Sequence, residues 1–176
     1  MWSTVPVRRW GDAPTVEAIL NFDDFFRAEY RKAVLLAYAV SGSYAAAEDI
    51  AQEAMLEAHR WWDRICRYDK PGAWLRRVTI QKASRRLRRR RSEAAAMDQM
   101  GALQLIPKGP GEVEAVFEAL RSLPTRQRAA ISLYYLDGYS VADTALALGC
   151  AEGTVKAHLH KGRRALARIL GEGFEE

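Results

Sequence analysis

The fold is decided by the stretch SVADTALALGCAEGTVKAHLHKG, residues 140–162. It opens on Ser140, whose hydroxyl can cap a short helix, and Gly149 then supplies the left-handed residue of a tight turn. Beyond the glycine, Val155 and Leu159 recur at helical spacing and are expected to face inward. Two helices joined by such a turn form a helix-turn-helix, which can place its second helix in a major groove of DNA.

The outward side of this second helix carries residues that suit contact with DNA. Lysine can contact guanine edges or phosphate, histidine can donate a hydrogen bond, and an alanine methyl can touch thymine. Arginines around the rim, Arg128 and Arg164 among them, are expected to contact the DNA backbone. The alternative is an ordinary helical hairpin packed in a bundle. The candidate DNA-contacting residues of this part are Arg126, Thr154, Lys156, Ala157, His160, Lys161 and Arg163.

The rest of the chain shows helical periodicity and no β-type alternation. A cluster of helix breakers at residues 107–111 separates two parts. We expect an all-α fold of two small helical domains, one of three helices and one of four, joined by a flexible linker. The expected segments are an extension at 1–20, a first domain at 21–91, the linker at 92–111 and a second domain at 112–171. The expected helices run from Phe22 to Val40, Tyr44 to Ile65, Ala73 to Arg91, Glu112 to Ser122, Thr125 to Leu136, Val141 to Leu148 and Glu152 to Leu170.

An arginine-rich run ends the first domain. Nine basic residues and no acidic residue lie between Trp74 and Arg91. Such a helix can bind phosphates strongly without reading sequence, and its affinity for DNA should fall steeply with salt. Tyr68 and Trp74 could stack on unpaired bases, although aromatic residues at such positions more often belong to a core. The alternative for the basic run is a solvated basic helix end or a disordered tail.

The composition narrows the class of protein. The formal net charge is +5 and the pI about 9.4, which favours an acidic partner such as nucleic acid. Cys66, Cys150 and the three histidines have no companions at metal-ligand spacing, so we expect no metal and no cofactor. The sequence holds no apolar run of the roughly 20 residues that a membrane span needs, so we expect a cytoplasmic protein that does not bind a membrane.

The sequence resembles the sigma factors of bacterial RNA polymerase that are of the extracytoplasmic-function type. The phrase AEDIAQEA, residues 47–54, is similar to the segment that docks on the clamp helices of the largest polymerase subunit. The resemblance implies that Asp49, Gln52 and Glu53 bind core polymerase, and that the flap of the second subunit is a further contact. The phrases at residues 119–128 and 148–156 resemble the module that reads the minus-thirty-five element.

The segment PGAWLRRV, residues 71–78, with the arginine-rich end, resembles the part that melts and reads the minus-ten element. Gln81 and Arg85 depart from the commoner Asn and Asp, and Ala151 replaces the frequent serine cap at a cost of about 1 kcal/mol. Residues 143–145, Asp-Thr-Ala, stand where Glu-Ile-Ala is commoner. The residues that the resemblance assigns to minus-ten DNA are Tyr68, Trp74, Arg76, Arg77, Gln81, Lys82, Arg85 and Arg88.

The expected function is therefore that of a sigma factor, which binds core polymerase and promoter DNA and directs initiation of transcription. A stand-alone regulator is the alternative, because residues 154–158 also resemble the recognition helix of LuxR-type proteins. No nucleophile, base and orienting acid lie at interpretable spacing, so we expect no catalysis. The sequence leaves open whether an anti-sigma factor binds the chain, and it does not specify the promoter or the role of residues 1–20.

Overall fold

The computed structural model describes residues 21–97 and 112–170, and the expected extension at 1–20 and most of the expected linker lie outside them. The described residues form helices joined by short connections, with no strand among them, so the all-α prediction is confirmed. The first domain contains α1 (Phe22–Ser41), α2 (Tyr44–Arg60), α3 (Trp62–Ile65) and α4 (Pro71–Met97). The second contains α5 (Glu112–Ser122), α6 (Thr125–Ile131), the π-helical turn η2 (Ser132–Leu136), α7 (Val141–Leu148) and α8 (Glu152–Leu170).

Local capping signals set the ends of α1 and α2. The Asn21 side chain accepts a hydrogen bond from the backbone N–H of Asp24 at 2.9 Å, which satisfies a free donor of the first turn. Gly42 ends α1 with φ of 71°, a left-handed conformation that favours glycine. Ser43 then caps α2 by accepting from the N–H of Ala46. The chain therefore reverses sharply between the two helices.

Three helices differ from the sequence prediction. The expected second helix is interrupted at Trp61, whose φ and ψ of −111° and 18° leave the helical range, so α3 is a separate turn. Helix α4 continues past Arg91 to Met97, because Ser92–Met97 contains strong helix formers and no glycine or proline. The predicted helix at 125–136 changes to π-helical geometry over its last five residues.

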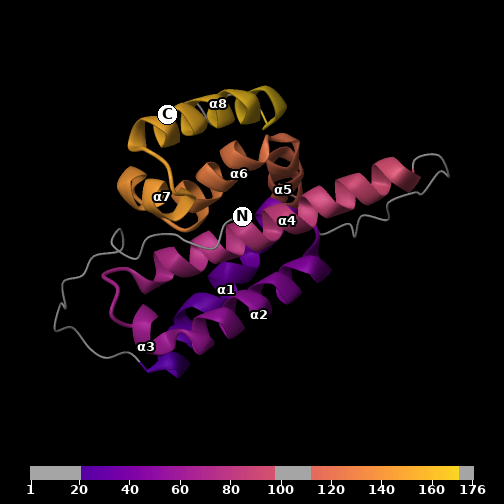
Figure 1. Cartoon of the computed structure of the whole chain (residues 1–176). Coiled ribbons are helices and arrows are strands. Elements are labelled where there is room, and N and C mark those ends of the chain that lie inside the picture. Colours follow the sequence, from indigo (N-terminus) through magenta and orange to yellow (C-terminus); the bar gives the residue numbers. More distant parts are fainter. Residues whose placement is uncertain (1–20, 98–111, 171–176) are drawn as a thin grey trace.

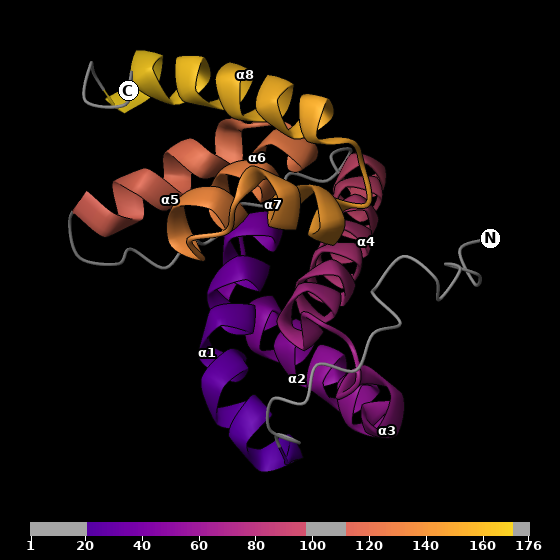
Figure 2. The same cartoon turned by 90° about the vertical axis from the view of Figure 1, so that its left-hand side faces the viewer.

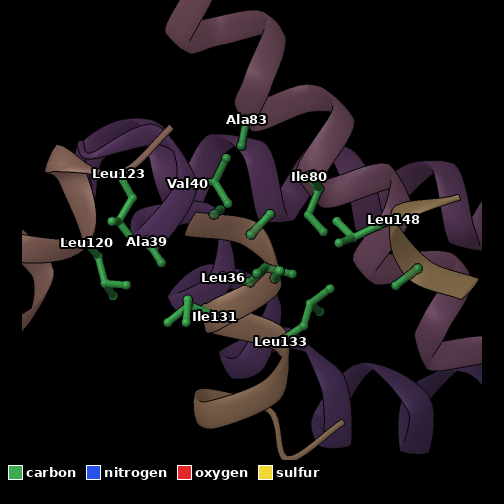
Figure 3. Close-up of a cluster of buried hydrophobic side chains, with 14 of the residues drawn as sticks. Leu36, Ala39, Val40, Ile80, Ala83, Leu120, Leu123, Ile131, Leu133 and Leu148 are labelled. Carbon is green, nitrogen blue, oxygen red and sulfur yellow. The ribbon is translucent and has the colours of Figure 1, made fainter. Parts of the chain in front are cut away.

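The second domain lies across the end of α1 and along the first half of α4 (Figures 1 and 2). One hydrophobic core runs through both domains: Leu36 and Val40 of α1 pack in the same cluster as Ile131 and Leu133. Figure 3 shows these side chains together, with Ile80 of α4 close to Leu148 of α7. The sequence predicted both domains but not this shared core.

A second, smaller core belongs to the first domain alone. Phe25, Met55, Ile65 and Leu75 are buried there, and Tyr68 and Trp74 pack against the cluster. The first domain thus has apolar contacts of its own in addition to those with the second domain.

Candidate nucleic-acid interface

Helix α8 exposes the residues that the sequence assigned to DNA. Val155 and Leu159 are buried against the rest of the second domain, so the opposite side of the helix faces outward. Helix α8 also lies on the side of the second domain that is remote from α2 (Figure 2). The residues Thr154, Lys156, Ala157, His160 and Lys161 are exposed, and Arg163 is half-buried. We call these six residues the α8 face. It has the shape of a helix that can enter a major groove.

The turn before α8 is built as the sequence predicts. Ser140 Oγ accepts from the backbone N–H of Asp143 at 3.0 Å and so caps α7. Gly149 ends α7 with φ of 65°, in the left-handed region. At the start of α8, Ala151 contributes only its carbonyl, which accepts from the N–H of Thr154 at 3.0 Å. The cap that a serine would provide there is therefore missing.

Half-buried His158 lies among cations. Burial lowers the pKa of His158, and the nearby positive charges of Arg126 and Lys161 lower this pKa further. Protonation of His158 therefore opposes the folded state. His160, in contrast, is exposed.

Two arginines that were expected at the rim of the DNA interface differ from each other in exposure. Arg126 is exposed, and its Nη1 donates to the carbonyl oxygen of Leu148 at 3.0 Å. Arg128 is only 1% exposed, and its Nη1 and Nη2 donate to the carbonyls of Val40 at 2.8 Å and Leu123 at 2.9 Å. The expected contact of Arg128 with the DNA backbone is wrong, because its guanidinium is enclosed at the ends of two helices.

The expected docking residues form an exposed acidic ridge on α2. The side chains of Asp49 and Glu53 are 58% and 54% exposed, and Gln52 is also exposed. Basic residues of α4 approach them from one side: Arg86 Nη2 lies 3.5 Å from Asp49 Oδ2, and Lys82 Nζ lies 3.5 Å from Glu53 Oε2. Exposed pairs at such distances are weak, so the ridge is available to a partner.

The minus-ten candidates on α4 and in the turn before it divide into accessible and covered residues. Arg85 and Arg88 are exposed, and Gln81 and Lys82 are half-buried. Trp74 and Tyr68 are half-buried against the smaller core, which is the ordinary alternative considered for them. Arg77 is half-buried, and its guanidinium lies 3.1 Å from the place that a Cβ on Gly149 would take.

Arg76 is the candidate whose placement differs most from expectation. Its side chain is 1% exposed, its Nε donates to Asp137 Oδ2 at 2.9 Å, and its Nη1 pairs with Glu29. The guanidinium carbon also lies 5.5 Å from the centroid of the Tyr139 ring. In this arrangement both carboxylates are bonded to Arg76 and solvent is excluded, so the expected DNA contact of Arg76 stays a prediction that requires the domains to separate.

Further contacts join the start of α4, and the residue before it, to the second domain. Lys70 pairs with Asp143 of α7, and this hydrogen bond is the main cause that lowers the pKa of Asp143. Burial raises the pKa of the Tyr139 hydroxyl, which lies close to Gly72. Sequence reasoning missed the roles of Glu29 and Asp137, because neither residue belongs to a motif and no spacing relates them to Arg76.

Within 21–97 and 112–170, no three or more His, Cys, Asp or Glu side chains are grouped so that they could hold a metal ion. None of the helices in these ranges is both long and apolar enough for a bilayer span.

Comparison with known proteins adds to this geometry. The family model for Sigma-70 region 2 matches residues 25–93, and the model for Sigma-70, region 4 matches residues 114–166. The ECF RNA polymerase sigma factor SigM of Mycobacterium tuberculosis is 40% identical over 154 residues, which cover 85% of this chain and 77% of SigM. SigL of the same species is 38% identical over 153 residues, which cover 80% of this chain and 84% of SigL.

A solved structure is similar to this chain over both domains. The sigma factor RpoE of Bartonella quintana, crystallised in complex with the anti-sigma factor NepR, superposes with a TM-score of 0.73 at 25% identity. The match covers 86% of this chain and 98% of that one, so it includes both helical domains. Together with the exposed α8 face and the acidic ridge of α2, these matches decide the family: the chain belongs to the sigma-70 family and, within it, to the ECF RNA polymerase sigma factors.

Proposed function

We propose that the chain binds core RNA polymerase through the acidic ridge of α2 and promoter DNA through the α8 face. The observation that carries this proposal is that both surfaces are exposed in one chain, at separate places and with opposite charge. Asp49, Gln52 and Glu53 suit the clamp helices of the largest subunit, and the second domain is assigned to the flap of the second subunit. The chain then has no covalent step of its own to perform.

On the DNA side, the α8 face reads duplex DNA of the minus-thirty-five element. Lys156 and His160 suit base edges, whereas Thr154 and Arg163 suit phosphates. Neutralised phosphates release counterions, so affinity should fall with salt. Family membership disfavours the LuxR-like alternative, which would leave the acidic ridge of α2 without a role.

The minus-ten role of α4 requires the two domains to separate. Arg85 and Arg88 can meet DNA phosphates in the present arrangement, but Arg77 is covered by the turn at Gly149. Separation would uncover Arg77. Tyr68 and Trp74 are half-buried against the core of the first domain itself, and their exposed edges could stack on unpaired bases. We call the present structure, with the two domains packed together, the closed arrangement, and a structure with the domains apart the open arrangement. Polymerase binding can favour separation if polymerase binds the open arrangement more tightly than the closed one.

An anti-sigma factor is a further proposed partner. The solved sigma factor of Bartonella quintana was crystallised with one, and its similarity to this chain extends over both domains. A protein that binds the closed arrangement more tightly than the open one would hold the chain inactive. All of these partners place the proposed activity in the cytoplasm.

Co-purification with core polymerase tests the proposal. The full chain with an affinity tag should retain core polymerase, and charge reversal at Glu53→Lys should reduce the retained amount by at least about tenfold. Asp63→Lys, an exposed site on α3, makes the same charge change away from the ridge and should retain polymerase. Equal retention by the wild type and Glu53→Lys would contradict docking through α2.

A further inference from the structure

The loop between η2 and α7, residues 137–139, covers one side chain of the first half of α4. Asp137 Oδ2 accepts a hydrogen bond from Arg76 Nε at 2.9 Å, and the centroid of the Tyr139 ring lies 5.5 Å from the guanidinium carbon of Arg76. Gly138, between the two, has φ of 68°, a left-handed conformation that favours glycine. The loop thus places a carboxylate and an aromatic ring of the second domain against one guanidinium of the first.

The second domain itself holds this loop in shape. The backbone N–H of Asp137 donates to the carbonyl of Ser132 at 3.2 Å, and the N–H of Tyr139 donates to the carbonyl of Leu133 at 3.0 Å. Both acceptors belong to η2, so the two bonds do not require α4. The loop can therefore keep its shape whether or not Arg76 is bound to it.

The first domain contributes the other half of the contact. Arg76 Nη1 pairs with Glu29 of α1, which lies in the same domain, so separation of the domains would remove only the bond between Nε and Asp137. In the closed arrangement the side chains of Arg76 and Asp137 are 1% and 6% exposed, which keeps DNA from this guanidinium. The neighbouring Arg77 lies against the turn at Gly149.

We propose that residues 137–139 occupy the place of a DNA nucleotide at Arg76 and so inhibit the chain until the domains separate. A carboxylate matches the donors of a guanidinium as a phosphate does, and arginine packs against aromatic rings as it packs against bases. The inference rests on the proposed minus-ten role of α4 and adds how access to it is regulated. The alternative is a contact that only stabilises the packed domains.

Competition between the loop and DNA sets the affinity of the free chain. A single strand must displace Asp137 and Tyr139 before it can reach Arg76, so the apparent affinity is reduced by the fraction of chains that are open. Loss of the Asp137 carboxylate should raise that fraction, because the closed arrangement loses a hydrogen bond between charged groups. A partner that binds the open arrangement more tightly would act in the same direction.

Binding of a fluorescein-labelled thymidine oligonucleotide to the full chain, without polymerase, tests the proposal by fluorescence anisotropy. Asp137→Asn should bind this single strand at least about fivefold more tightly than wild type. Small-angle X-ray scattering should give a larger radius of gyration for Asp137→Asn, since more chains are open. The double variant Asp137→Asn/Arg76→Gln should lose most of the gain in affinity, because the uncovered guanidinium is then missing.

Two further variants complete the design. Asp143→Asn makes the same charge change at the same interface, where it breaks only the exposed pair with Lys70, and it should alter affinity by less than about twofold. Tyr139→Leu removes the ring from Arg76 and leaves Asp137 in place. It should raise the affinity at least about twofold, which tests the loop independently if Asp137→Asn does not fold.

Three results would overturn the proposal. Unchanged affinity of Asp137→Asn and Tyr139→Leu, with or without a larger radius of gyration, would reduce the loop to a structural contact. An equal gain in Asp143→Asn would indicate an effect of net charge, and a gain that persists in Asp137→Asn/Arg76→Gln would exclude Arg76 as the group that DNA reaches. Retention of wild type on core polymerase depends on α2 and tests the proposed function separately, so either can fail without the other.

Discussion

Arg76 Nε of α4 donates to Oδ2 of Asp137 at 2.9 Å, and this bond joins the two domains at a place that is almost closed to solvent. Glu29 of α1 binds the same guanidinium from the first domain. The three residues therefore form a buried charged contact in which one cation is shared by two carboxylates. It lies where α7 covers the first half of α4, the segment that resembles the minus-ten reader.

Removing one carboxylate from this contact should destabilise the closed chain. We expect Asp137→Asn to lower the free energy of unfolding by about 2 kcal/mol, because a buried hydrogen bond to a charged group is lost while Arg76 stays enclosed. Chemical denaturation measures this change. Lys70→Ala is the control: it removes an exposed pair across the same interface and should cost less than about 1 kcal/mol. Equal effects of the two variants would show that Arg76 is not held as described.

Two glycines of α8 should respond oppositely to alanine. A Cβ at Gly162 would lie 2.8 Å from Cγ1 of Ile131 in the core, so Gly162→Ala should destabilise the chain by about 1–3 kcal/mol. Gly153 has nothing within 4 Å of an added Cβ, and Gly153→Ala should stabilise α8 by about 0.5 kcal/mol through helix propensity. Thermal unfolding distinguishes the two. Destabilisation by Gly153→Ala would contradict the open surroundings of that residue.

The α8 face should account for the salt dependence of duplex binding. Lys161→Glu should weaken binding of promoter duplex and reduce the slope of log affinity against log salt by about 1 or more, since a phosphate contact is lost. Fluorescence anisotropy at several salt concentrations gives both values. Arg31→Glu, which changes the charge equally at an exposed site on α1, should leave the slope nearly unchanged. A slope that fell equally in both variants would indicate an effect of net charge alone.

Acid should destabilise the chain through His158. Its pKa is lowered in the folded state, so the unfolded chain binds more protons as the pH falls below the ordinary value of 6.5. Stability should therefore be constant above that pH and fall from it down through the lowered pKa. Denaturation at about pH 8 and about pH 5 measures the difference. His158→Gln should lose less stability between these values than wild type does, and an unchanged difference would contradict the assignment to His158.

Local signals in the sequence predicted much of this fold. Ser140 and Gly149 set the limits of α7 through a cap and a left-handed turn, and both depend only on nearby residues. The outward side of α8 followed from the periodicity of Val155 and Leu159, because a helix that buries one side must expose the other. These features need no knowledge of the rest of the chain.

The contact between the domains could not be predicted in this way. Leu36 and Leu133 are far apart in the sequence, and an apolar helix face gives no indication of which other face covers it. Arg76 and Arg128 look like any other basic residues of a DNA-binding surface. Their burial depends on acceptors at Asp137 and Val40, which become neighbours only after the domains have packed.

Promoter-directed transcription with purified components tests the central claim most directly. Core RNA polymerase should give a discrete transcript from a cognate promoter only when this chain is added, and Lys156→Glu in the α8 face should abolish start-site selection while retention on polymerase persists. The account is contradicted if core polymerase with the chain yields no discrete transcript from any template of a genomic promoter library, while a known sigma factor does so under matched conditions.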